Sequence, residues 1–172
     1  KRYPPVDKEL AAGSDGTTLE FMQKFFLDAY EAINPNLAKD KVVVFHDCFE
    51  LTAWKDFMRP DNSSDGKYTN VVLDTHQYLM MAEMQGCPHT LDGYISFIKD
   101  KFENGVEEMQ QYFPVICGEW CLFNSLAVGA DTKGGQTVLN GVMNDPVPSF
   151  SDADKKKIYN TLADAQLKAW DK

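Results

Sequence analysis

Apolar side chains recur at helical spacing near the start of the chain. A capping box, Thr17-x-x-Glu20, comes first, and an apolar residue then occupies every fourth position: Phe21, Phe25, Ala29 and Ile33. This spacing places the four side chains on one face of a helix. The sequence therefore predicts a helix that ends at Asn34-Pro35-Asn36, a typical breaker.

The longest periodic segment covers residues 91–112. Its apolar stripe consists of Leu91, Tyr94, Ile95, Ile98, Phe102, Val106 and Met109, with charged residues between them. We expect one long helix here, stopped by Pro114. A short helix is expected over 51–58. A last helix is predicted from near Ser151 to the end of the chain, with Trp170 packed and Gln166 at the surface.

Three short apolar runs lie between these helices, at 42–45, 71–73 and 115–117, and the strand that begins at 71 is expected to run on to about Tyr78. Continuous runs rich in β-branched residues are typical of strands that are buried on both faces, as in a parallel sheet. Helices that alternate with strands predict right-handed crossovers in an α/β fold. An open doubly wound sheet and part of a (β/α)₈ TIM barrel both fit. We find no internal repeat or second-domain linker, so residues 1–172 are predicted to form a single domain.

Polar residues cluster where each strand ends. His46-Asp47 follows the first strand, His76-x-Tyr78 ends the second, and Glu119-Trp120 follows the third. Barrels and open parallel sheets both place ligand sites at this end of their strands. The pattern therefore predicts a site without choosing between the two folds.

Two of these motifs have a functional and a structural interpretation. Glu119, preceded by a glycine, is costly to bury unless it is functional or paired with an arginine. His76 and Tyr78 share one strand face and could hold a carboxylate between them, or they could be ordinary core residues. The residues alone leave both readings open.

Composition narrows the function classes. The 172 residues are 44% hydrophobic and 12% aromatic, which is enough for a sizeable core. The net charge of −9 disfavours nucleic-acid binding, and no apolar run is long enough to span a membrane. The three histidines lack zinc-site spacing, and no strand is followed by a nucleotide-binding glycine motif. No metal or cofactor is expected, whereas a neutral polyhydroxylated ligand is compatible with this charge.

Taken together, the strand-end segments resemble glycoside hydrolase family 5. VVLDTHQY (71–78) followed by PVICGEW (114–120) is similar to the sixth and seventh strands of that family. VVFHDCF (43–49) resembles the fifth strand of its fungal exo-β-1,3-glucanase branch. LNG (139–141) and AQLKAW (165–170) also resemble later segments of this branch.

The resemblance implies part of a (β/α)₈ barrel and a hydrolase that cleaves β-glycosides with retention. Glu119 matches the nucleophile, and Tyr78 matches the residue whose hydroxyl holds that carboxylate. His76 matches a histidine of the −1 sugar site. Phe49 and Asn140 match an aromatic wall and a partner for a sugar hydroxyl. The implied substrate is a β-glucan oligosaccharide or polysaccharide, and the family has no cofactor.

The chain also departs from the family pattern. It contains no Asn-Glu pair, which in the family carries the acid/base, and it matches only three of eight strands, from about the fourth helix to the seventh. We expect a chain truncated at both ends that is unstable alone or completes its barrel with further segments, and that is inactive by itself. A β-1,4-glucanase and a non-catalytic carbohydrate-binding remnant are the alternatives. The family favours an extracellular or cell-wall location and leaves a cytoplasmic one open.

Overall fold

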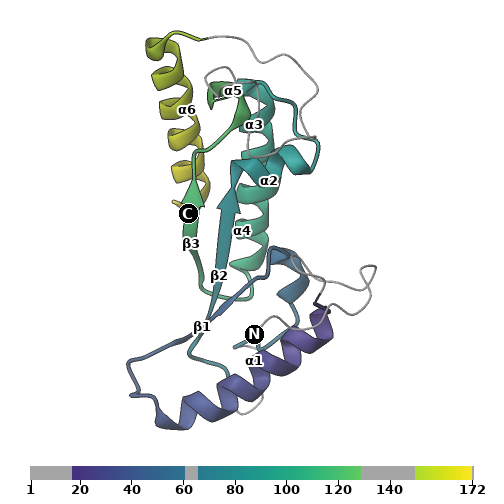
Figure 1. Cartoon of the computed structure of the whole chain (residues 1–172). Coiled ribbons are helices and arrows are strands. Elements are labelled where there is room, and N and C mark those ends of the chain that lie inside the picture. Colours follow the sequence, from purple (N-terminus) through teal and green to yellow (C-terminus); the bar gives the residue numbers. More distant parts are fainter. Residues whose placement is uncertain (1–16, 61–65, 129–149, 172) are drawn as a thin grey trace. The chain divides into compact units, whose positions relative to one another are not determined.

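The computed structural model describes residues 17–60, 66–128 and 150–171, which form six α-helices, three strands and three short helical turns (Figure 1). In chain order these are α1 (Leu19–Ile33), η2 (Asn34–Asn36), β1 (Val43–His46), η3 (Leu51–Trp54), β2 (Val71–Tyr78), α2 (Leu79–Met84), α3 (Leu91–Phe97), η4 (Ile98–Glu103), α4 (Asn104–Met109), β3 (Val115–Cys121), α5 (Ser125–Val128) and α6 (Asp152–Trp170). None of the helices within these described ranges is long and apolar enough to cross a membrane.

The strands form one parallel sheet in the order β1-β2-β3. β1 pairs with β2 in a register that places Val43 opposite Val71 and His46 opposite Asp74. The Leu73 N–H donates to the Pro114 carbonyl, 3.0 Å away, where β3 begins. The α/β class and the parallel sheet with flanking helices are thereby confirmed. This arrangement is compatible with part of a barrel, and the complete barrel and the single domain stay predictions.

The long helix forms as predicted, with a π-helical turn in its middle. α3, η4 and α4 follow one another without a break from Leu91 to Met109. The Thr90 hydroxyl caps the first turn by accepting the Gly93 N–H at 3.0 Å. Tyr94, Ile98, Phe102, Val106 and Met109 of the predicted stripe are all buried.

The chain divides into two compact units. The first contains residues 1–76 and 106–118, and the second contains residues 77–105 and 119–172. The core of the first unit is rich in aromatic rings, which pack edge to face around Phe45. The ring centroids of Trp54, Phe57 and Phe113 lie 5.4, 5.8 and 5.8 Å from that of Phe45. Edge-to-face contacts of this kind add to the hydrophobic stabilisation of a core.

The first helix is confirmed, but the apolar stripe that the spacing singled out is not the one that packs. Phe21, Phe25 and Ile33 are 40, 42 and 46% exposed. The neighbouring stripe packs instead against the core of the first unit, through Leu19, Met22, Phe26, Leu27 and Tyr30. The N-cap is Thr18 rather than Thr17, because its hydroxyl accepts the Phe21 N–H at 3.2 Å.

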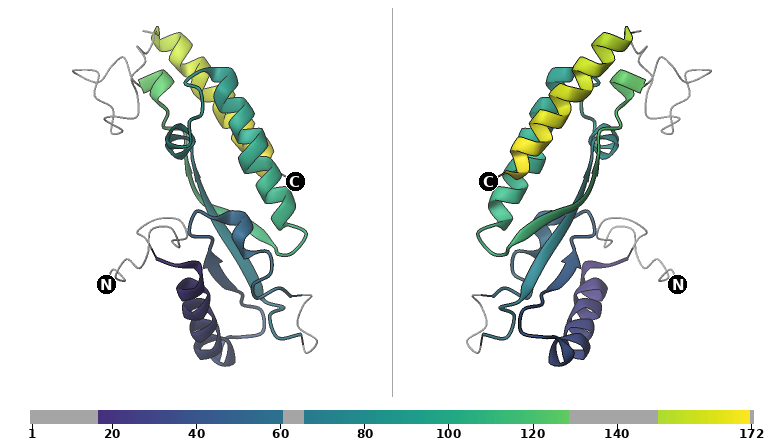
Figure 2. Two further views of the ribbon diagram at one scale, coloured as in Figure 1. Left: turned by 90° about the vertical axis from the view of Figure 1, so that its right-hand side faces the viewer. Right: turned by 90° about the vertical axis from the view of Figure 1, so that its left-hand side faces the viewer.

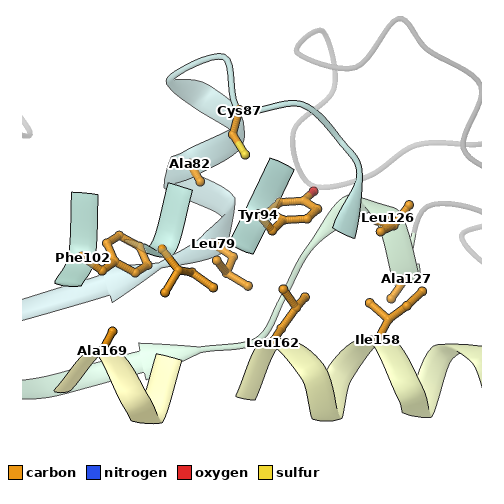
Figure 3. Packing of buried hydrophobic residues seen from close by; sticks show 11 residues of the cluster. Leu79, Ala82, Cys87, Tyr94, Phe102, Leu126, Ala127, Ile158, Leu162 and Ala169 are labelled. Atoms are coloured by element: carbon orange, nitrogen blue, oxygen red, sulfur yellow. The ribbon is translucent and has the colours of Figure 1, made fainter. Parts of the chain in front are cut away.

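The second unit packs α6 along α3 and η4, as Figure 2 shows. Ile158, Leu162 and Ala169 of α6 meet apolar side chains of α2, α3 and η4 in its core (Figure 3). Ser151 begins α6 as predicted, since its hydroxyl accepts the Asp154 N–H at 3.2 Å. Gln166 was expected at the surface, and this is wrong: its side chain is fully buried.

A buried carboxylate joins three segments of the second unit. Glu83 in α2 is only 2% exposed. Its Oε1 accepts the Ser125 N–H at 2.6 Å and the Tyr94 hydroxyl, while its Oε2 accepts the Ser125 hydroxyl at 2.5 Å. Burial raises the pKa of Tyr94, and the hydrogen bond to Glu83 raises it further. Tyr94 therefore stays a donor, and the charge of Glu83 is compensated by hydrogen bonds.

Replacing Glu83 by glutamine should destabilise the protein. The amide offers one acceptor oxygen where the carboxylate offers two, so a buried donor loses its partner. We expect the free energy of unfolding to fall by about 1–3 kcal/mol in urea titrations. Glu108→Gln is the matched control, because the Glu108 side chain is 44% exposed and its ion pair with Lys55 lies at the surface; this variant should change stability by less than about 0.5 kcal/mol. Equal effects in the two variants would contradict this role of Glu83.

For Gln166 we expect the opposite effect of a substitution on the free energy of unfolding. Neither Nε2 nor Oε1 of its buried side chain has a hydrogen-bond partner among the described residues. Methionine has a similar length and no such polar atoms, so Gln166→Met should leave the free energy of unfolding unchanged or raise it by about 1–2 kcal/mol. Gln166→Glu should lower it, because a charge would be buried at the same place. A clear loss of stability in Gln166→Met would contradict an unsatisfied amide.

Candidate functional site

The end of β1 turns sharply through two residues with left-handed backbone geometry. Cys48 and Phe49 have φ angles of 53° and 63°, a region that residues other than glycine rarely adopt. Side chains capture both of their N–H groups. The Cys48 N–H donates to Nδ1 of His46 at 3.0 Å, and the Phe49 N–H donates to Oδ1 of Asp47 at 2.9 Å. These two hydrogen bonds offset the cost of the backbone conformation.

Asp47 fastens this turn to its surroundings. The residue is 1% exposed. The Thr75 hydroxyl donates to its Oδ2 at 2.6 Å, and the Trp54 indole N–H donates to its backbone carbonyl at 2.7 Å. Burial raises the pKa of Asp47, and the hydrogen bonds from Thr75 and the Phe49 N–H act against that rise. The turn is therefore fixed both to β2 and to the core of the first unit.

Three rings gather where β1 and β2 end. The ring centroids of His46 and His76 lie 4.2 Å apart, those of His46 and Phe49 lie 5.2 Å apart, and those of Phe49 and His76 lie 6.4 Å apart. Phe49 is 36% exposed, and the side chains of His46 and His76 are 29% and 23% exposed. The structure thus brings two of the sequence-predicted site residues, Phe49 and His76, into one partly exposed cluster of rings.

His46 and Asp74 join this cluster. His46 was indicated only as part of the strand-end pattern, without a role, and Asp74 was not predicted. Oδ2 of Asp74 lies 3.2 Å from Nε2 of His76. Oδ1 of Asp74 accepts the Gly118 N–H at 2.8 Å. The sequence held one signal for Asp74, namely that it lies two residues before His76 in a strand and so shares its face. Nothing in the sequence alone showed that its carboxylate reaches β3.

Tyr78 and Glu119 belong to the second unit. Tyr78 ends β2 and is half-buried, while Glu119 lies in β3 and is exposed. The residues beside them in the chain are fastened to α6. The rings of Trp120 and Trp170 lie 5.0 Å apart, and the Trp170 indole N–H donates to Oε1 of Gln77 at 2.6 Å. Trp170 is therefore a packing residue, as expected, and it holds positions next to both Tyr78 and Glu119.

Asn140 lies outside the described residues. Within residues 17–60, 66–128 and 150–171, no cluster of three or more histidine, cysteine or acidic side chains could hold a metal ion. The arrangement offers carboxylates, ring nitrogens and aromatic surface, which together can bind a neutral polar ligand and carry out acid–base or nucleophilic chemistry.

Curated relatives are found for this chain, although no family model matches it. It is 28% identical over 164 residues to the glucan 1,3-beta-glucosidase I/II of Saccharomyces cerevisiae, a match that covers 86% of this chain and 35% of that protein. It is 29% identical over 116 residues to the glucan 1,3-beta-glucosidase 1 of Schizosaccharomyces pombe, covering 67% of this chain and 25% of that protein.

A third relative is the probable glucan 1,3-beta-glucosidase D of Aspergillus clavatus, which is 26% identical over 159 residues. That match covers 75% of this chain and 18% of the relative. The chain thus spans about a third or less of the length of these curated relatives. All three bear the names of glucan-hydrolysing glycosidases, and they confirm the resemblance to glycoside hydrolase family 5 that the strand-end motifs indicated.

Proposed function

We propose that this chain carries the nucleophile and part of the sugar-binding wall of a retaining β-glucan glucosidase. The observation that carries the proposal is the ring cluster of His46, Phe49 and His76 at the strand ends where the sequence predicted a site. The names of the three relatives support a glucan as the substrate. Because the chain covers only part of those relatives, the activity of the whole protein is included in the proposal.

Glu119 is the proposed nucleophile. In a retaining mechanism its ionised carboxylate attacks the anomeric carbon, the glycosidic bond breaks, and a covalent glycosyl-enzyme forms. Water then attacks the same carbon, releases the sugar with its original configuration and restores the carboxylate. In this proposal the Tyr78 hydroxyl holds the Glu119 carboxylate in its attacking orientation. An oriented nucleophile lowers the entropic part of the activation barrier for this attack.

The second carboxylate of the mechanism must come from outside these 172 residues in this proposal. It protonates the leaving oxygen in the first step and removes a proton from water in the second. The family places it directly after an asparagine, and this sequence contains no Asn-Glu pair. Glu50 and Glu83 are poor substitutes. Both carboxylates of a retaining pair must flank one bond about 5–5.5 Å apart, and Glu83 is buried among three hydrogen-bond donors.

The ring cluster is the proposed wall of the −1 sugar site. A pyranose presents C–H surface on its faces and hydroxyls around its rim. An exposed ring such as Phe49 can cover the C–H surface, while the polar atoms of His76 and Asn140 bind hydroxyls. The left-handed turn at Cys48 and Phe49 presents that ring from a rigid support, which reduces the entropy lost on binding.

Covalent trapping tests the nucleophile. A 2-deoxy-2-fluoro-β-glucoside with a dinitrophenolate leaving group needs no general acid, because the leaving group departs as a stable anion. In the native polypeptide that contains these residues, peptide mapping by mass spectrometry should find the fluoroglucosyl group on Glu119. Glu119→Gln should slow turnover of ordinary substrate at least about a thousandfold, and it should abolish labelling.

The matched control is Glu50→Gln, which should label at the wild-type rate. A label on another carboxylate would disprove the assignment of Glu119. Binding of glucan oligosaccharides without any labelling would favour the carbohydrate-binding remnant. Protection from labelling by β-1,3-linked but not β-1,4-linked oligosaccharides would support a β-1,3-glucan substrate, and the reverse order would favour the β-1,4-glucanase.

A further inference from the structure

We infer that Asp74 is a positioning residue that fixes the tautomer of His76 and holds the strand leading into Glu119. Asp74 and the residues that it contacts, Asp47, His76 and Gly118, all belong to the first unit. The effect of these contacts on catalytic turnover rests on the proposed function.

Asp74 lies at the junction of the three strands. Its backbone carbonyl accepts the Asp47 N–H at 2.8 Å, just past the end of β1. Its Oδ1 accepts the Gly118 N–H at 2.8 Å in β3. Gly118 directly precedes Glu119 in the chain. One residue therefore ties the turn that presents Phe49 and the part of β3 at Gly118 to the strand that carries His76.

The glycine at position 118 is explained by this contact. A Cβ at Gly118 would lie 2.9 Å from both Cγ and Oδ2 of Asp74, and closer still to Oδ1. Carbon atoms do not approach a carboxylate that closely, so the carboxylate occupies the place of the missing side chain. A larger residue at 118 would force Asp74 out of its bonds to both β3 and His76.

The same carboxylate determines which nitrogen of His76 carries the proton. Oδ2 can only accept, and it lies 3.2 Å from Nε2 of His76. The proton of the neutral imidazole is therefore on Nε2, and Nδ1 is an acceptor. The Asp74 and His76 side chains are 18% and 23% exposed, so solvent competes only partly for this bond. The ring of His46, 4.2 Å away, limits rotation of the imidazole.

An orienting carboxylate behind a histidine is a general device of active sites, because it fixes both the tautomer and the ring plane. His76 would then meet the sugar with the same nitrogen in every molecule. Misplacement of such a group by about 1 Å can cost about 100-fold in rate. Asp74 acts through His76 and Gly118, and it does not itself touch the substrate.

Asp74→Asn separates the two roles of Asp74, which are to bind the Gly118 N–H and to fix the tautomer of His76. The amide has one acceptor oxygen for two donors, the Gly118 N–H and the His76 Nε2–H. A backbone N–H cannot be removed, whereas an imidazole can move its proton to the other nitrogen. We therefore expect the amide oxygen to keep Gly118, its NH₂ group to donate to Nε2, and His76 to switch to the Nδ1–H tautomer.

Nitrogen-15 NMR of histidine-labelled native polypeptide reads this switch directly. The spectra are recorded at a mildly alkaline pH where imidazoles are neutral, and the His76 signals are assigned by their loss in His76→Gln. Wild type should show the proton on Nε2, and Asp74→Asn should show it on Nδ1. Asp56→Asn, at a residue whose side chain is 82% exposed, is the matched control and should match wild type.

A wild-type His76 protonated on Nδ1 overturns the proposal, even if no variant folds. An unchanged tautomer in a folded Asp74→Asn overturns it as well. Gly118→Ala provides an independent variant and should release His76 from the Nε2–H tautomer. These outcomes do not depend on whether the protein is a glycosidase.

The functional consequence is measured separately. If wild type is labelled on Glu119, Asp74→Asn should lower kcat about 100-fold with a smaller change in KM, and Asp56→Asn should leave both unchanged. Labelled wild type with an unaltered kcat in Asp74→Asn would overturn the positioning role alone. A wild type that is never labelled would instead contradict the proposed function, and the tautomer of His76 would still decide the structural part.

Discussion

The parallel register of β1 and β2 is the constraint on which the candidate site depends. It places His46 opposite Asp74, so the residues that follow β1 reach the polar end of β2. A slip by one residue would turn His76 and Asp74 to the other face of the sheet. The alternating burial of β2 prevents this, because Val71, Leu73, Thr75 and Gln77 are buried while the residues between them are half-buried.

Two buried carboxylates, those of Asp47 and Glu83, hold loops and turns in a single conformation through their hydrogen bonds. Asp47 binds the hydroxyl of Thr75 and the N–H of Phe49, and Glu83 binds Tyr94 and Ser125. Each carboxylate joins a loop or turn to a neighbouring element through bonds that water cannot easily replace. The cost of burying the charge is offset only when every bond is in place, and this favours a single local conformation over others. Asp47 thereby supports the turn that exposes Phe49.

The sequence was sufficient to predict the position of the strands and the long helix. The expected burial of the strands on both faces is wrong for β1 and β3, because Val44 and Ile116 are 46 and 45% exposed. The stripe from Leu91 to Met109 spans five turns, and no competing stripe has the same apolar content. The face of α1 could not be predicted in this way. Phe21 and Phe25 have the same spacing as Met22 and Phe26, and only tertiary packing decides between the two faces. The burial of Gln166 was missed because an amide in a helix is usually at the surface.

For the site, the strand-end motifs indicated Phe49 and His76, which the structure brings together. They did not indicate Asp74, because its bond to Gly118 joins residues 44 positions apart. The left-handed turn at Cys48 and Phe49 was not predicted, since these two positions hold no glycine or asparagine. Its cause is the pair of acceptors on His46 and Asp47, each of which binds the N–H two residues further along the chain.

The most direct measurement is a crystal structure of the native polypeptide after reaction with the 2-fluoroglucoside. A strand-end glycosidase site requires electron density for a bond between a Glu119 carboxylate oxygen and the anomeric carbon, with the rings of Phe49 and His76 beside the same sugar. A sugar bound to a different carboxylate, or held without a covalent bond and away from these rings, would contradict the central claim.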